Sequence, residues 1–241
     1  MANLSKNTSG NWLESFSRSE IYSFLSAVYK DEVNLDYIEA SLSEKFWYEQ
    51  GERAGRFCPE VANAYQAFLS DLNKWSDSVS GEPDSVKEDL ELRKEFAYLF
   101  LTPHGVKPYE SIYRGKKNLL MDKPWEEVRN FYRWAGISKD NNEMHPEDHL
   151  SVELGFMAVF SYISGEEAAD GKGEKSDQPG SDELTLALEV QQKFLELHLA
   201  KWVPAFCSDM QKKARHIFYI NIAGLTGSFI ELDRLIINKH I

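Results

Sequence analysis

Apolar residues recur at helical spacing along most of this chain, and no run alternates convincingly with the two-residue period of a strand. Ser17 and Glu20 have the spacing of a capping box, and the apolar stripe that follows predicts a helix over residues 17–29. The most regular stripe predicts a second helix over residues 61–75. The pattern therefore predicts an all-α fold, with residues 1–241 forming a single large helical bundle.

Proline and glycine mark where the remaining helices begin and end. Asp84 or Ser85 can cap a helix that runs to Phe100, where Pro103 and Gly105 end it. Further helices are expected at residues 124–136, 150–163, 184–202 and 218–236. Pro146 should begin the second of these and Pro204 should end the third.

Three connecting segments interrupt this helical pattern. Residues 102–115 are expected to form a loop. Residues 165–181 carry Gly, Ser and charged side chains with almost nothing large and apolar, so burial cannot offset their ordering entropy, and a flexible surface loop of open role is expected. Residues 136–146 could form a hinge between an N-terminal and a C-terminal half.

Charge and composition narrow the classes of function. The net charge of −12 would repel nucleic acid and favours a basic partner, although a negative surface can also serve solubility alone. Cys58 and Cys207 stand apart in the sequence, which predicts neither a disulfide nor a zinc site. No apolar stretch approaches the roughly 20 residues of a membrane span, and the first ten residues do not resemble a secretory signal. A cytoplasmic protein that is not embedded in a membrane is expected.

Sequence motifs for covalent or nucleotide chemistry are missing. The chain has no GxSxG, no phosphate loop, no GxGxxG after a strand and no Cys/His pair set up for nucleophilic attack. We therefore expect that the protein is not an enzyme and uses neither a metal nor another cofactor.

The densest cluster of aromatic and proline residues lies between Glu95 and Tyr113. Prolines stiffen a loop, so aromatic rings and a carboxylate on it can be held ready for a ligand at a reduced ordering cost. The alternative is that these rings only cap the core. The candidate binding residues are Tyr98, Phe100, Pro108, Tyr109, Glu110 and Tyr113.

A second cluster surrounds Pro146. His145, His149 and Glu153 recur every four residues, which on one continuous helix would suit a metal-dependent hydrolase, but Pro146 at the first helical position would leave His145 outside that helix. We expect Asp148 in the first helical turn instead, as an acceptor for a guanidinium, with His149 as a hydrogen-bonding neighbour or a structural histidine.

Residues 95–115, EFAYLFLTPHGVKPYESIYRG, resemble the Tyr-x-x-Leu-Phe, Pro and Pro-Tyr-Glu-Ser-x-Tyr pattern of the TorD family of redox-enzyme maturation chaperones, which includes the DmsD and NarJ types. Residues 145–157, HPEDHLSVELGFM, resemble that family's Pro-x-Asp-His-x-x-x-Glu-Leu-x-Phe-Met stretch. Residues 194–210 and 218–230 resemble its C-terminal helices. The similarity spans roughly residues 19–236.

The resemblance implies a chaperone without catalytic activity. Its partners would be the twin-arginine leader and the apo-catalytic subunit of a molybdenum oxidoreductase, together with molybdenum-cofactor biosynthesis proteins, and the client would be retained until its cofactor is inserted. The sequence does not identify the client, decide whether a guanine nucleotide binds, or distinguish a monomer from a domain-swapped homodimer. A helical adaptor for another partner is an alternative function. The family's peptide-binding region falls on Tyr98, Phe100, Pro108, Tyr109, Glu110, Tyr113, Asp148, His149 and Glu153.

This chain departs from the family pattern within the loop. Leu101, Thr102 and Pro103 stand where many members carry Gly-Pro, and Lys107 precedes a single Pro108 where a second proline is common. The shape of the loop, and with it the preferred leader, therefore stays open.

Overall fold

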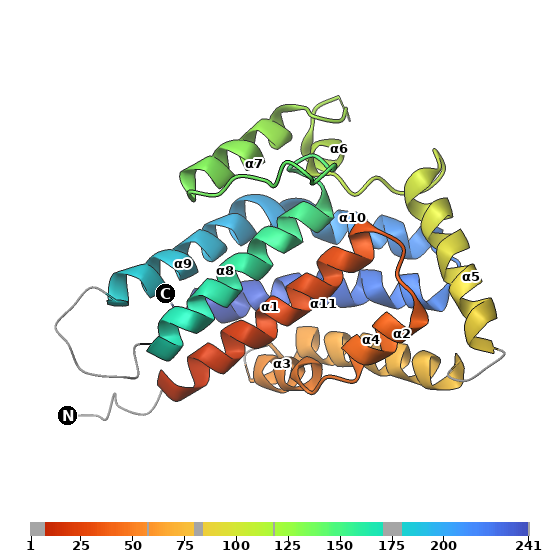
Figure 1. Cartoon of the computed structure of the whole chain (residues 1–241), viewed down its shortest axis with the longest axis horizontal. Coiled ribbons are helices and arrows are strands. Elements are labelled where there is room, and N and C mark those ends of the chain that lie inside the picture. The colour runs from red at the N-terminus through yellow and green to blue at the C-terminus, as the bar shows by residue number, and fades with distance from the viewer. Residues whose placement is uncertain (1–7, 57, 80–83, 118, 171–179, 241) are drawn as a thin grey trace.

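The computed structural model shows an all-α chain, which confirms the expected fold class (Figure 1). It describes residues 8–56, 58–79, 84–117, 119–170 and 180–240. Across these ranges no β-strand occurs, and the one isolated β-bridge joins Tyr109 to His149. No helix in this described part of the chain is long and apolar enough to span a bilayer.

The helices follow one another in the order α1 (Thr8–Lys30), α2 (Leu35–Leu42), α3 (Phe46–Gly55), α4 (Pro59–Val79), α5 (Asp84–Phe96), the π-helix η1 (Ala97–Leu101), α6 (Glu110–Arg114), α7 (Lys123–Trp134), α8 (Leu150–Asp170), α9 (Gly180–Phe194), the π-helix η2 (Leu195–Leu199), α10 (Ala200–Lys213) and α11 (Ile217–His240).

One pair of long helices and one group of three form the centre of the bundle. Helices α1 and α8 lie side by side along most of their length (Figure 1), and Ser19 and Ser26 of α1 each donate a hydrogen bond to a carbonyl of α8, at 2.9 and 2.7 Å. Helix α11 packs on α4 and α10. A Cβ at Gly224 of α11 would lie 2.4 Å from the Phe68 ring of α4, so a larger residue there would require that ring to move. Small and hydroxyl side chains thus set the spacing of the core.

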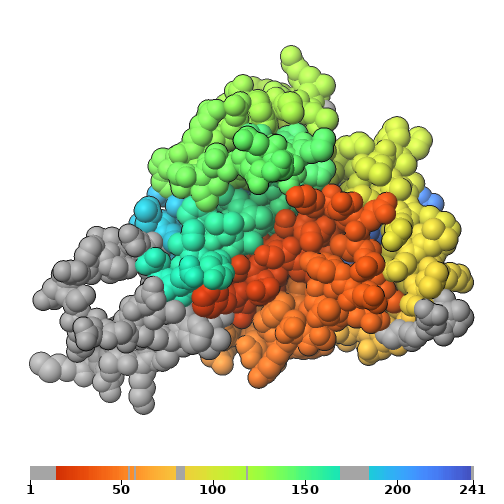
Figure 2. All heavy atoms as spheres, viewed as in Figure 1, coloured from red at the N-terminus to blue at the C-terminus, as the bar shows by residue number. Residues whose placement is uncertain are grey.

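Helices α6 and α7 form a separate layer over α8 and α9 (Figure 1). Aromatic rings join this layer to the bundle: Tyr132 stacks on Phe156 of α8 with ring centroids 4.6 Å apart, and Phe131 lies 5.2 Å from Phe194 of α9. Offset and edge contacts of this kind add to the burial of the rings themselves. Figure 2 shows this layer in space-filling form against α8.

Most expected helices are confirmed, since residues 17–29, 61–75, 84–100 and 218–236 are helical and residues 124–136 correspond to α7, which ends at Trp134. Helices α2 and α3 were not anticipated. For α2 the signal was present, because the Asn34 side chain accepts from the Tyr37 amide as an N-cap, and Leu35, Ile38 and Leu42 form a buried stripe.

Two expected helix ends near prolines were wrong. Helix α8 begins at Leu150 and not at Pro146, because the backbone of residues 148–150 pairs with the loop at residues 108–110. Pro204 does not end a helix but lies inside α10. Proline inside a helix costs about 3 kcal/mol or more, and the buried side chains on both sides of it, Trp202, Val203, Phe206, Cys207 and Met210, offset that cost.

Both expected loops are shorter than predicted. Residues 110–114 form α6, a single turn held by contacts with residues distant in sequence. Helix α8 continues to Asp170 and α9 begins at Gly180, so the ends of the expected 165–181 loop are helical, and residues 171–179 lie outside the described residues. The hinge at residues 136–146 stays a prediction.

Candidate functional site

The structure brings the two sequence clusters together. Tyr109 and His149 form the antiparallel β-bridge, the Glu110 amide donates to the Asp148 carbonyl at 2.9 Å, and the Leu150 amide donates to the Pro108 carbonyl at 2.8 Å. These main-chain bonds fix the end of the aromatic loop against the segment before α8. Pro108, Tyr109 and Glu110 therefore lie beside Asp148 and His149, whereas these bonds do not include Tyr98 and Phe100 of η1.

Asp148 takes a different place from the one expected. It lies two residues before α8, so it is not in the first turn of that helix, and its Oδ2 accepts from the Ser111 amide at 3.0 Å, in the first turn of α6. The side chain is fully buried, and this burial raises the pKa of its carboxyl against the lowering effect of the Ser111 bond. Its second oxygen, Oδ1, has no partner among the described residues.

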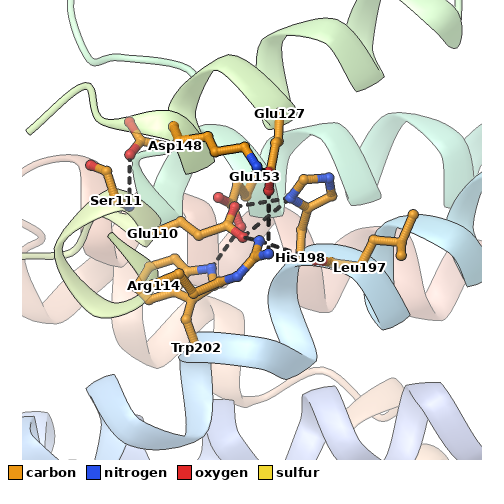
Figure 3. A network of polar contacts seen from close by, with 10 residues as sticks. Glu110, Ser111, Arg114, Glu127, Asp148, Glu153, Leu197, His198 and Trp202 are labelled. Atoms are coloured by element: carbon orange, nitrogen blue, oxygen red, sulfur yellow. Dashed lines mark hydrogen bonds and ion pairs between the residues drawn. The ribbon is translucent and has the colours of Figure 1, made fainter. Parts of the chain in front are cut away.

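Glu110 is the centre of a buried ionic cluster between α6, α8 and η2 (Figure 3). Its carboxylate is fully buried and accepts from the Arg114 guanidinium, one helical turn further along α6, and from Nδ1 of His198 at 3.0 Å. Arg114 also reaches Oε2 of Glu127 at 3.3 Å and the Leu197 carbonyl at 3.2 Å. Its side chain is 28% exposed, so Arg114 separates Glu110 from solvent.

Glu153 of α8 lies in the same cluster. Its Oε2 accepts from the Trp202 indole at 3.0 Å, and its side chain is fully buried. Burial, followed by the negative charge of Glu110, raises the pKa of Glu153 well above its ordinary range. Its Oε1 has no partner in the described part of the chain when both carboxyls are ionised. A proton on Glu153 would let it donate to Glu110, so the two groups share one negative charge.

Sequence reasoning missed four members of this region: Ser111, Arg114, His198 and Trp202. The Glu110 to Arg114 spacing of four residues was a usable signal, since it places the two side chains together on any helix. The contact of His198 with Glu110 joins residues 88 positions apart and had no local signal. The π-helix η2 carries His198, and π-turns of this kind often occur at functional sites.

The His145 and His149 rings stack face to face, with centroids 4.0 Å apart and planes 14° from parallel. In stacked imidazoles the nitrogen lone pairs point in parallel directions, so they do not converge on one metal ion. In addition, Nδ1 of His149 is bonded to the Ser151 hydroxyl at 2.7 Å. Burial, then the charge of His145, lowers the pKa of His149 to about 3. Within the described ranges, no group of three or more ligating side chains could hold a metal, so the geometry does not favour the hydrolase alternative.

The aromatic candidates divide their surfaces between core and solvent. Tyr98, Phe100, Tyr109 and Tyr113 are half-buried, whereas Pro108 is buried. Phe100 and Tyr113 pack against the hydrophobic core, as the alternative interpretation supposed, and the guanidinium of Arg215 lies 3.3 Å from the Tyr98 ring centre. Each of the four rings keeps some accessible surface, and Tyr109 and Tyr113 contact residues of the site itself, His149 and Trp202.

A surface pocket of about 530 Å³ lies elsewhere, at the C-terminal end of α1, and contains none of the predicted site residues. Both of its cations are paired: Lys30 contacts Glu143 at 2.5 Å, and Arg93 lies 3.9 Å from Glu32. The opposite charges on its lining balance one another, so the pocket indicates no particular class of ligand.

Comparisons with known proteins agree with the sequence motifs. The family model described as nitrate reductase delta subunit matches residues 56–208, which include the ionic cluster. The chaperone protein TorD of Photobacterium profundum is 30% identical over 221 residues, covering 90% of this chain and 92% of the relative. The chaperone protein TorD of Vibrio parahaemolyticus is 28% identical over 221 residues with the same coverage, and that of a classical Vibrio cholerae strain is 27% identical over 226 residues, covering 93% of each.

Proposed function

The chain belongs to the nitrate reductase delta subunit family, together with the TorD chaperones, and from this membership we propose its function. The protein binds the twin-arginine leader and the apo form of a molybdenum oxidoreductase until the client's cofactor is inserted. The observation that carries the proposal is the similarity to proteins named chaperones along about nine tenths of the chain. The close packing of the two motif segments supports it.

Leader recognition follows from the chemistry of the peptide. A twin-arginine leader offers two guanidiniums followed by an apolar stretch, and a guanidinium forms its strongest bonds with carboxylates. Glu110 and Asp148 are the carboxylates for this role, with Glu153 and His149 beside them, and Oδ1 of Asp148 is unpartnered among the described residues. The accessible parts of the rings at Tyr98, Phe100, Tyr109 and Tyr113 would cover the apolar stretch, and Pro108 would stiffen the loop before Tyr109.

This role belongs in the cytoplasm, where the leader exists before export, and its partners would include proteins that make the molybdenum cofactor. The net charge of −12 suits a cationic peptide, because opposite charges speed association. The leader must become ordered on binding, so the affinity should be moderate. Either a monomer or a domain-swapped dimer could present this site.

The test is titration calorimetry with a synthetic Arg-Arg leader peptide and its Lys-Lys version. Both peptides carry the same charge, so only the planar guanidinium fork distinguishes them. We expect the Arg-Arg peptide to bind more tightly, by roughly 1–3 kcal/mol, the range for a charged hydrogen bond. Equal binding would remove guanidinium recognition from the proposal, and no binding of either peptide would contradict the leader-binding function itself.

A further inference from the structure

The cation in the buried cluster belongs to the protein itself. Arg114 carries the only guanidinium that contacts Glu110 within the described residues. It occupies the place on Glu110 that a leader arginine would need under the proposed function. Since Glu110 has no exposed surface, an incoming guanidinium can reach it only by moving a group that covers it.

Arg114 is suited to move. It is the last residue of α6, and its side chain is 28% exposed, in contrast to the full burial of Glu110 and Glu153. Apart from Glu110, its contacts are long, at 3.2 Å to the Leu197 carbonyl and 3.3 Å to Glu127, whose own side chain is 38% exposed. An outward rotation of Arg114 would therefore open the cluster without unpacking the core.

Glu153 is a second acceptor in reserve. Its Oε1 is buried beside the carboxylate that Arg114 contacts (Figure 3), and apart from the proton shared with Glu110 it has no hydrogen-bond partner in the described chain. A second positive charge in the cluster would allow that proton to leave, because both carboxylates could then be ionised. Of the two neighbouring glutamates, Arg114 bonds Glu110. A guanidinium has five N–H donors, so one placed between the two carboxylates can bond both.

We propose that Arg114 is an internal substitute for an arginine of the client: it closes the Glu110 and Glu153 site in the free protein, and the leader guanidinium displaces it. This inference rests on the proposed function. The apparent affinity for the leader is then lowered by the fraction of molecules in which Arg114 already occupies the site. Removing Arg114 should therefore strengthen peptide binding. If Arg114 contacted the peptide directly, its removal would weaken binding instead.

The experiment compares Arg114→Met and Arg114→Lys with the wild-type protein and with Arg133→Met. Arg133 lies on α7, is exposed and donates to Asn130, so its removal changes the charge equally without touching Glu110. We expect Arg114→Met to bind the Arg-Arg peptide on the order of tenfold more tightly than Arg133→Met does, the gain for a site otherwise open about a tenth of the time. Arg114→Lys keeps Glu110 paired with a cation, so it should fold, and it should give a smaller gain in the same direction.

A second measurement uses no peptide. Millimolar ethylguanidinium at fixed ionic strength should raise the thermal midpoint of Arg114→Met more than ethylammonium does, and neither should affect Arg133→Met. If the wild-type protein binds the Arg-Arg peptide but the Arg114 variants bind no more tightly than Arg133→Met, the substitution model is wrong while the proposed function stands. If the wild-type protein and every variant ignore the peptide, the proposed function fails and this inference fails with it.

Discussion

Glu153 shows how its surroundings decide the chemistry of a single side chain. In the sequence it was one of three residues at four-residue spacing, a pattern that suggested a metal site but that Pro146 disfavoured, and the family resemblance placed it in the peptide-binding region. In the structure its carboxyl is buried beside Glu110 and bonded to the Trp202 indole, which is 49 positions away. Burial and the neighbouring charge raise its pKa, so the folded protein holds a proton that the unfolded chain releases above about pH 4.3.

We predict that Glu153→Gln stabilises the protein at pH 8. A native state that binds more protons than the unfolded state loses stability as the pH rises from the unfolded pKa toward the raised folded pKa. The glutamine amide keeps the shape and the donor of a protonated Glu153 without this loss. The free energy of unfolding of Glu153→Gln should therefore exceed that of the wild-type protein at pH 8 by more than the roughly 0.5 kcal/mol of a neutral surface substitution, and the difference should vanish near pH 4. Urea unfolding at both pH values measures it.

Glu126→Gln is the control for that experiment, because Glu126 is exposed on α7 and its substitution should leave the free energy of unfolding within about 0.5 kcal/mol. A Glu153→Gln variant that is less stable than the wild-type protein at pH 8 would mean that the carboxyl is ionised and satisfied in the folded state. The shared proton between Glu110 and Glu153 would then be wrong.

At the scale of elements, α6 depends on contacts that its own sequence does not provide. A helix of five residues is too short to be stable in water by itself. Its first turn is held by Oδ2 of Asp148 on the Ser111 amide, and Glu110 at its start is held by the His198 ring of η2. The sequence therefore indicated a loop at residues 102–115, since no local signal reports an acceptor 37 positions away.

Replacing Asp148 should destabilise α6, and the effect should depend on whether the new side chain still accepts a hydrogen bond from the Ser111 amide. Asp148→Ala removes the acceptor of the buried Ser111 amide and should cost roughly 1–3 kcal/mol, whereas Asp148→Asn keeps an oxygen there and should cost less. Hydrogen exchange of the Ser111 amide measures the effect locally, and urea unfolding measures it globally. Unchanged Ser111 protection in Asp148→Ala would show that another group holds the turn.

The elements that could be predicted are those whose own residues bury a long stripe. Residues 61–75 repeat apolar side chains over four turns, and the structure has α4 there. The missed features depend on other parts of the chain: Pro204 is tolerated because α10 is packed on both sides of it, and the π-turn η2 has no periodicity of its own. For the site, the motif residues were found from the sequence, and their burial and their partners Arg114 and His198 were not.

At the scale of the whole molecule, a buried polar contact joins the first helix to the last. The guanidinium of Arg18 in α1 contacts both carboxylate oxygens of Asp233 in α11, and it also donates to Gln191 of α9 at 2.7 Å. The Tyr22 hydroxyl donates to the same carboxylate at 2.6 Å. Asp233 is fully buried and Arg18 nearly so, hence each charge depends on the other.

Asp233→Ala should therefore destabilise the entire bundle. It leaves the Arg18 guanidinium buried without its counter-ion, which typically costs about 3–5 kcal/mol, and for a chain of this size the thermal midpoint should fall by on the order of 10 °C. Glu231→Ala in the same helix removes a carboxylate that pairs with Arg234 and is 40% exposed, so the change should stay below about 1 kcal/mol. Differential scanning calorimetry of both variants tests the difference. Similar small shifts in the two would mean that the Arg18 guanidinium is satisfied without Asp233, for example by its bond to Gln191, and that the ion pair does not hold α1 to α11.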